Sequence, residues 1–241
     1  MSAPPAIEQE LTEVRAATAR LLATVDGLGD AHVGKASSLP GWTVGHVLTH
    51  VARNADGNRR IAGGAARGEV LEQYPHGVEG RAADIEAGAG RPAADLAVDV
   101  RTSAAALDAT WMALPIGAWD QTVRPMSGEQ PVRQTVVSRR REVEVHHIDL
   151  GLGYRPGDWP AAFVARELER AGSGLPGRLP PGTAVRLAGR DLEWAIEVGD
   201  GPASVSVSGP GAWVLAWLLG RRVPASALWA PAGLPDLGPW Q

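Results

Sequence analysis

Residues 139–150 read RRREVEVHHIDL, and this stretch decides both the fold and the candidate site. Taken as a helix, it places Glu142 and His146 on one face, because residues four apart in a helix lie one turn above each other. An apolar stripe runs beside that face, formed by Val132, Val136, Val143 and Leu150. Ionisable side chains next to a buried stripe are typical of a helical bundle that holds a site between its helices.

A second segment supplies the third member of the candidate site. Thr43 is suited to cap a helix that carries His50. The apolar stripe of that helix is formed by Val44, Leu48, Val51 and Ala55. Two histidines and one carboxylate, with coordination positions left open, are how proteins hold a reactive divalent metal ion. We therefore predict that His50, Glu142 and His146 bind a metal, for which zinc, iron and nickel are all suitable.

Simpler interpretations of these residues exist. A glutamate and a histidine four apart are often a solvated pair on a helix surface, with no metal involved. His46, one turn before His50, is either a further ligand or a solvent-facing side chain. His147 is a poorer candidate, because on a helix it points about 100° away from His146.

Two polar residues lie about one turn from the proposed ligands. Asn54 and Asp149 can each orient a ligand histidine, and Asn54 is also a candidate to contact a bound cofactor. For Asp149 we favour a capping group at the end of the helix, because Gly151 follows closely. The charge run at residues 139–141 predicts a solvated face or contacts with carboxylates, and not nucleic-acid binding.

Three further segments predict the rest of the bundle. Residues 7–28 and 93–114 carry apolar side chains at helical spacing, and residues 130–150 form the last helix, with a proline near its first turn. Residues 61–92 are rich in Gly and Ala. We interpret most of them as a long connection with one helical piece, such as a lid or binding loop. A four-helix domain is expected over residues 1–155.

The pattern changes after that point. Residues 159–171 can form a helix, and an apolar helix is expected at residues 211–219. Three segments between them are rich in β-branched residues and separated by Gly or Asp turns, which predicts strands at residues 183–188, 193–198 and 203–207. The expected fold class is therefore α+β, with a four-helix bundle followed by a small α/β domain over residues 156–241.

Composition excludes several classes of protein. The 241 residues include no cysteine, which excludes disulfides, a cysteine nucleophile and cysteine-ligated metals. The net charge of −4 gives no electrostatic basis for binding nucleic acid or an anionic membrane. The apolar stretch at residues 212–219 is too short to span a bilayer, and residues 1–10 lack the apolar run of a signal peptide. We expect a cytoplasmic protein that is a monomer or a small oligomer.

Four segments resemble one protein family. They are residues 41–56 (GWTVGHVLTHVARNAD), 74–86 (YPHGVEGRAADIE), 141–150 (REVEVHHIDL) and 216–221 (AWLLGR). In this order they resemble the mycothiol-dependent maleylpyruvate isomerases of actinobacteria, and the resemblance covers nearly the whole chain. The motifs are more specific to the superfamily than to one substrate.

The resemblance implies a DinB-like four-helix bundle and a small C-terminal domain. It implies that zinc is held by His50, Glu142 and His146, and that mycothiol is the thiol cofactor. The functional arginine of the family's C-terminal domain matches Arg221, with Arg222 as the adjacent alternative. The implied reaction is the cis–trans isomerisation of maleylpyruvate to fumarylpyruvate, as in gentisate-type aromatic catabolism.

The chemistry of such a reaction fits the composition. A carbon–carbon double bond rotates only after its π character is removed, and a thiolate that adds to it and is later expelled achieves this. The thiol must come from outside, because the chain has no cysteine. A metal can activate a thiol or polarise a carbonyl, and arginine forks suit the two carboxylates of the substrate. Arg221 is one such partner, and Arg81, in the Gly-rich stretch, is our second candidate.

Other functions are compatible with the same metal ligands. A thiol S-transferase would keep the thiol adduct on a different electrophile. A metal-binding scaffold would have no turnover at all, because fold and site alone do not determine function. Metal-assisted hydrolysis needs a general base, for which the candidates are His46, Asp56 and Asp149. The ligand motif does not separate these functions, whereas the residues of the substrate pocket do.

Overall fold

The structure is a computed structural model that describes residues 3–199 and 203–238. The contacts divide the chain into two compact units, Met1–Gly153 and Tyr154–Gln241. In the first unit helices dominate and the only strands described form a short hairpin, whereas the second unit combines helices with a three-stranded sheet. The α+β class expected from the sequence is confirmed.

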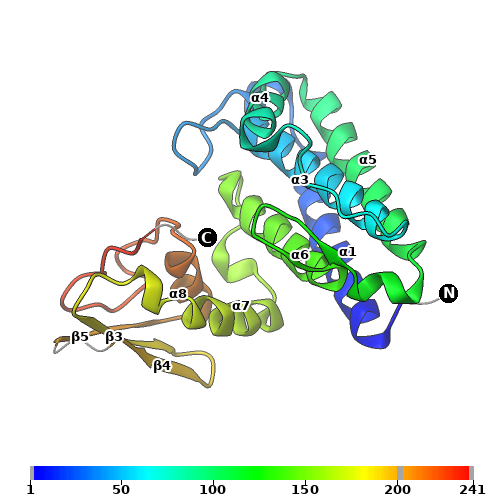
Figure 1. Ribbon diagram of the computed structural model, residues 1–241. Helices are drawn as coiled ribbons and strands as arrows, with labels where there is room; N and C mark the ends of the chain where they lie inside the picture. Colours follow the sequence, from blue (N-terminus) through cyan, green and yellow to red (C-terminus); the bar gives the residue numbers. More distant parts are fainter. Residues whose placement is uncertain (1–2, 200–202, 239–241) are drawn as a thin grey trace. The chain divides into compact units, whose positions relative to one another are not determined.

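Long helices form the body of the first unit (Figure 1): α1 (Pro5–Val25), α3 (Val44–Ala65), α5 (Ala93–Met112) and α6 (Val132–Asp149). Each buries an apolar stripe at helical spacing, as the sequence predicts. Helix α3 contacts both α5 and α6, and its Val47, Leu48 and Val51 are completely buried. Because α3 packs directly against α6, polar residues that flank the two buried stripes are brought together.

The start of α3 is fixed by Thr43, as predicted. Its hydroxyl accepts a hydrogen bond from the backbone N–H of His46, and its own backbone N–H donates to Nδ1 of His46 at 3.1 Å. This reciprocal arrangement is a capping box, which satisfies backbone donors that the first turn leaves without partners. His50 lies one turn after His46, so the cap also determines where His50 enters the bundle.

Two parts of the first unit differ from the expectation. Residues 61–92 are mostly helical: α3 extends to Ala65, and α4 (Gly77–Ala89) follows the short connection at residues 66–76. The interpretation as a long connection was wrong because tertiary packing overrides the weak helix propensity of Gly. Residues 130–131 also belong to a hairpin, so α6 begins only at Val132. The short elements of this unit are α2 (Asp30–Val33), the 3-10 helix η1 (Ile116–Asp120), β1 (Thr122–Val123) and β2 (Gln130–Pro131).

The second unit contains the expected helices and strands. They are the helices α7 (Ala161–Ser173) and α8 (Gly211–Leu218), and the strands β3 (Thr183–Gly189), β4 (Trp194–Val198) and β5 (Ala203–Gly209). Two short 3-10 helices, η2 (Pro156–Asp158) and η3 (Pro176–Arg178), were not expected. Strand β3 is central, antiparallel to β4 and parallel to β5. Phe163, Leu187 and Leu215 are buried between the helices and the sheet. None of the described helices has both the length and the apolar character needed to cross a bilayer.

Candidate metal centre

The three predicted ligands converge at one point between α3 and α6. Nε2 of His50 lies 2.9 Å from Nε2 of His146 and 3.0 Å from Oε2 of Glu142. The third side of the triangle, from Nε2 of His146 to the same carboxylate oxygen, measures 3.5 Å. Within the described parts of the chain, no other three His, Asp or Glu side chains are arranged to share a metal ion.

Asp149 orients His146. Its Oδ2 lies 2.9 Å from Nδ1 of His146, and its side chain is completely buried. A carboxylate only accepts hydrogen bonds, so it keeps the ring proton on Nδ1 and leaves the Nε2 lone pair directed at the triad. Our preference for a capping role was therefore wrong, because Asp149 bonds back to a side chain one turn earlier on the same helix.

Arg81 and Trp42 contact His50 from the other side. Nη2 of Arg81, on α4, lies 2.9 Å from Nδ1 of His50. The Trp42 ring packs edge-on against the His50 ring, with 5.6 Å between centroids. Arg81 also lies over the ring of Tyr74, at 5.7 Å from its centroid. Arg81, which was chosen from the sequence as a carboxylate partner, is thus placed at the candidate site.

The ligands differ in protonation. Burial, together with the neighbouring His146, lowers the pKa of His50 to about 4, so its ring is neutral at pH 7. Burial alone would lower the pKa of His146, but hydrogen bonds to Asp149 and Glu142 raise it above its usual value. Burial alone would raise the pKa of Glu142, but hydrogen bonds to His146 and His50 hold it well below the usual value.

The donor set fits a divalent metal ion. Bonds of about 2.1 Å to a common metal separate neighbouring ligand atoms by about 3.0 Å in octahedral geometry and about 3.4 Å in tetrahedral geometry. The separations here, 2.9, 3.0 and 3.5 Å, are close to that range. Two imidazoles and a carboxylate suit zinc and other first-row metals, and three protein ligands leave coordination positions for another molecule.

Two of the ligands, His50 and Glu142, line a cavity of about 260 Å³. Its walls come from α3, from Gln73 and Tyr74 before α4, from the hairpin and from α6. Asn54 lines this cavity but does not orient His50, because its Oδ1 accepts from Nη1 of Arg139 at 2.8 Å and from Asn58 at 3.1 Å. Sequence reasoning missed Asn58 and Gln73. Asn58 follows Asn54 by one helical turn, a spacing that could have indicated it, whereas nothing in the local pattern indicated Gln73.

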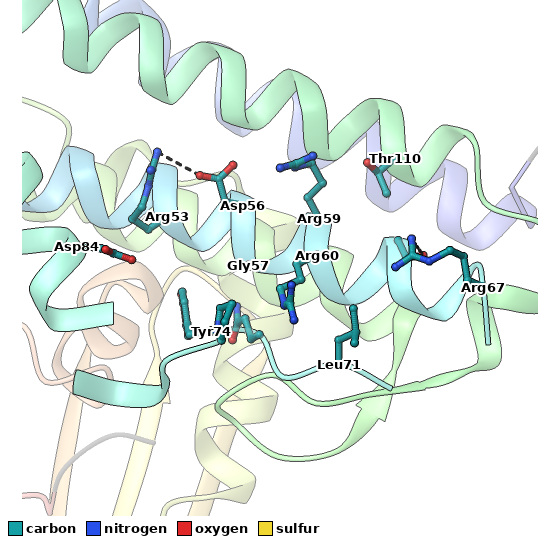
Figure 2. Close-up of a pocket in the computed structure, with 13 residues that line it drawn as sticks. Arg53, Asp56, Gly57, Arg59, Arg60, Arg67, Leu71, Tyr74, Asp84 and Thr110 are labelled. Carbon is teal, nitrogen blue, oxygen red and sulfur yellow. Dashed lines mark hydrogen bonds and ion pairs between the residues drawn. The ribbon is translucent and has the colours of Figure 1, made fainter. Parts of the chain in front are cut away.

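A larger cavity of about 560 Å³ lies on the other side of Gln73 and Tyr74, which line both cavities. Figure 2 shows the basic side chains along it, which are Arg53, Arg59, Arg60 and Arg67. Some of these charges are already neutralised; Arg53, for example, pairs with Asp56 at 3.1 Å. The described residues contain a metal-ligating cluster only in the smaller cavity, so that cavity is the candidate site.

The charge run at residues 139–141 is buried, contrary to the solvated face that we considered. The reason is the central place of α6: Arg140 pairs with Glu13 of α1, and Arg139 donates to the carbonyl of Val51 on α3. Contact with a carboxylate, the other interpretation, applies to Arg140. Arg221 belongs to the second unit and follows α8, where its Nη1 donates to the carbonyl of Leu219 at 2.7 Å.

Comparison with known proteins agrees with this geometry. A crystal structure of the mycothiol-dependent maleylpyruvate isomerase matches with a TM-score of 0.89 and 26% sequence identity over 97% of both chains. A mutant of that isomerase, with a histidine replaced by alanine, matches with a TM-score of 0.89 and 25% identity over 97% of both chains. No curated protein matches in sequence. The family model described as the mycothiol maleylpyruvate isomerase N-terminal domain matches residues 14–151, which confirms the resemblance, and the chain belongs to this family.

Proposed function

We propose that this chain is a mycothiol-dependent isomerase that converts maleylpyruvate to fumarylpyruvate at a divalent-metal site. The observation that carries the proposal is the convergence of His50, Glu142 and His146 beside a cavity that His50, Glu142 and Arg81 line. The family match and the structural similarity to a mycothiol-dependent maleylpyruvate isomerase support the same reaction.

His50, Glu142 and His146 would hold the metal, which we propose to be zinc. When bound there, the metal supplies Lewis acidity that stabilises a thiolate or polarises a substrate carbonyl. The protein prepares the site: Asp149 keeps the proton of His146 on Nδ1, and Trp42 packs against the ring of His50. These contacts fix the direction of the donor atoms before any metal arrives.

The thiol is external, because the chain contains no cysteine. Mycothiol would supply the nucleophile that temporarily removes the double-bond character of the substrate. The cavity of about 260 Å³ is smaller than the range of about 300–1,000 Å³ typical for drug-sized ligands. It therefore suits the small acid together with the thiol end of the cofactor.

Two arginines are proposed to bind substrate carboxylates. Arg81 would become available when a metal binds. A neutral His50 ring that binds the metal through Nε2 carries its proton on Nδ1, and a guanidinium can only donate hydrogen bonds. Arg81 would therefore lose its present acceptor, Nδ1 of His50, and turn to another one. Arg221 is proposed as the second partner. Replacing Arg221 and Arg222 separately by alanine decides between these neighbours, since only the functional one should raise the KM.

The decisive experiment is an isomerase assay on maleylpyruvate, using zinc-loaded protein with and without mycothiol. We expect turnover that depends on both the metal and the thiol. Stoichiometric metal without turnover would overturn the proposal and favour a transferase that conjugates the thiol to a different electrophile. If the protein binds no metal, His50, Glu142 and His146 are an ordinary cluster of polar side chains, and the proposal fails.

A further inference from the structure

The wall of the metal cavity that lies along α3 and Gln73 is uncharged and consists of primary amides. Asn54, Asn58 and Gln73 all line the cavity, and all three residues are buried. Asn54 and Asn58 follow His50 at successive turns of α3, so they extend from the metal ligands along the same helix. This wall differs from the cationic part of the cavity around Arg81.

The orientation of each amide follows from its partners. Arg139 only donates, so the atom of Asn54 that it contacts at 2.8 Å is the oxygen. The carbonyl of Asn54 only accepts, so the atom of Asn58 that contacts it at 2.9 Å is the nitrogen. The backbone N–H of Met126 donates at 3.0 Å, which makes its partner in Gln73 the oxygen.

One polar atom of each amide is then left over. These atoms are Nδ2 of Asn54, Oδ1 of Asn58 and Nε2 of Gln73. None of them has a hydrogen-bond partner among residues 3–199 and 203–238, and none is among the completely buried unpaired atoms. They are therefore not fully buried, and all three residues line the metal cavity, although Gln73 also lines the larger one. At the metal cavity these atoms can present two donors and one acceptor to a ligand. A buried site with preset donors and acceptors discriminates strongly against ligands that leave them unpaired.

We infer that Asn54, Asn58 and Gln73 form a specificity subsite that binds the dioxo-acid end of the substrate. An enolised 2,4-dioxo acid presents acceptors on its carboxylate and keto group and one donor on its enol hydroxyl, which complements two donors and one acceptor. The inference rests on the proposed function for the identity of the ligand. It assigns the amide wall to the dioxo-acid end, and the metal with Arg81 to the end that carries the double bond.

The test measures binding to zinc-loaded protein by calorimetry with two probes. Acetylpyruvate has the dioxo-acid end without a cis double bond, and maleate has the cis double bond without the dioxo end. Gln73→Glu keeps the oxygen that accepts from Met126 but turns the free donor into an anionic acceptor. Asn58→Ser replaces the free amide oxygen by a shorter side chain, whose hydroxyl can still donate to the Asn54 carbonyl four residues earlier but no longer presents an acceptor at the position of Oδ1.

We expect both variants to bind acetylpyruvate about tenfold more weakly or worse, with maleate affected less than about twofold. Gln9→Glu is the charge-matched control, since it adds the same charge on the exposed surface of α1 and should leave both affinities unchanged. Zinc content and circular dichroism establish that each variant is folded and loaded. If Gln73→Glu does not fold, the same comparison of acetylpyruvate and maleate affinities is made with Asn58→Ser alone.

The outcomes separate this inference from the proposed function. Wild-type affinity for acetylpyruvate in both folded variants would overturn the subsite, and so would failure of the wild-type protein to bind acetylpyruvate while it isomerises maleylpyruvate. Variant-sensitive binding of acetylpyruvate without any isomerase activity would support the subsite and reject the proposed reaction. A wild-type protein that neither binds acetylpyruvate nor isomerises maleylpyruvate would reject both.

Discussion

Oδ2 of Asp149 lies 2.9 Å from Nδ1 of His146, and the carboxylate is completely buried at the end of α6. The contact joins two residues three apart on one helix. It has two consequences that act in opposite directions. It directs the lone pair on Nε2 toward the other ligands, and it raises the pKa of the ring, so that a proton competes with a metal ion.

Replacing Asp149 by Asn should weaken metal binding about 10–100-fold, the effect typical of a partner that orients a ligand. Asparagine has nearly the same shape but loses the negative charge that holds the imidazole proton. Competition with a chelator of known affinity measures the change in zinc dissociation constant. Asp108→Asn, at the partly exposed ion pair with Arg15, is the control. Equal zinc affinity in the two variants would show that Asp149 only stabilises the helix end.

His50→Ala and His146→Ala should each abolish stoichiometric metal binding while helical content is kept. Each change removes one of three ligands, and the two that remain do not hold a divalent ion firmly. Metal analysis after dialysis, together with circular dichroism, checks the prediction. His76→Ala, at an exposed position before α4, should retain the metal. Full metal content in both ligand variants would refute the assignment.

Metal binding should release protons near pH 6.5. In the metal-free protein the pKa of His146 is raised above its usual value of 6.5, so the ring is more than half protonated at that pH. The pKa of His50 is lowered to about 4, so this ring is already neutral and releases none. Only the neutral ring binds a metal, so zinc affinity should rise as the pH rises through the pKa of His146.

Calorimetric titration with zinc in buffers of different ionisation enthalpy measures this release directly. We expect between half a proton and about one proton per zinc ion at pH 6.5, decreasing toward higher pH. His76→Ala serves as a control, because His76 is exposed and is not a member of the triad. A binding enthalpy that does not depend on the buffer would contradict the prediction.

Arg81→Ala should raise the KM for maleylpyruvate about 10–100-fold and leave the zinc content unchanged. A hydrogen bond to a charged group contributes about 1.5–3 kcal/mol, and the alanine removes one of the proposed carboxylate partners without replacing a metal ligand. Steady-state kinetics with zinc-loaded protein measures the effect. Arg59→Ala, at an exposed arginine of the neighbouring cavity, should behave like the wild type. An unchanged KM in Arg81→Ala would remove this residue from substrate binding.

The sequence predicted the long helices and the triad because both depend on regular spacing. Burial of one helix face imposes apolar periodicity, and ligands four apart on α6 face the same way whatever surrounds them. Helix α4 was expected only as one helical piece without bounds, because it buries only Ile85 and Ala89 and so has almost no periodic signal. Asp149 was noticed, but its two possible roles differ only in side-chain direction, which a linear pattern does not contain.

Gln73 illustrates the other limit. It lies in the connection before α4, and its place in the cavity depends on a close approach to α3 at Gly57. A Cβ atom at Gly57 would lie 2.7 Å from Cγ of Gln73 and 3.2 Å from its carbonyl oxygen. The absence of a side chain at Gly57 therefore allows this wall of the cavity to form. A glycine within a helix normally indicates only a weak helix, so the sequence alone did not reveal this function.

Gly57→Ala should consequently destabilise the protein and weaken substrate binding together. The new methyl group displaces the Gln73 segment, and such overpacking costs about 1–3 kcal/mol. Gly63→Ala, six residues later in α3, is the matched control, since its Cβ would meet only the flexible end of Arg67 at 3.7 Å. There the gain in helix propensity should stabilise the protein by about 0.5–1 kcal/mol.

Denaturant unfolding of the two variants gives the stability changes, and the KM for maleylpyruvate reports on the cavity. The essential expectation is that the two changes in the free energy of unfolding have opposite signs, because both substitutions add the same methyl group to the same helix. If Gly57→Ala were as stable as Gly63→Ala and had a wild-type KM, Gln73 would not depend on the close approach to α3. The amide wall would then be flexible enough to adjust, which is incompatible with a preset pattern of donors and acceptors.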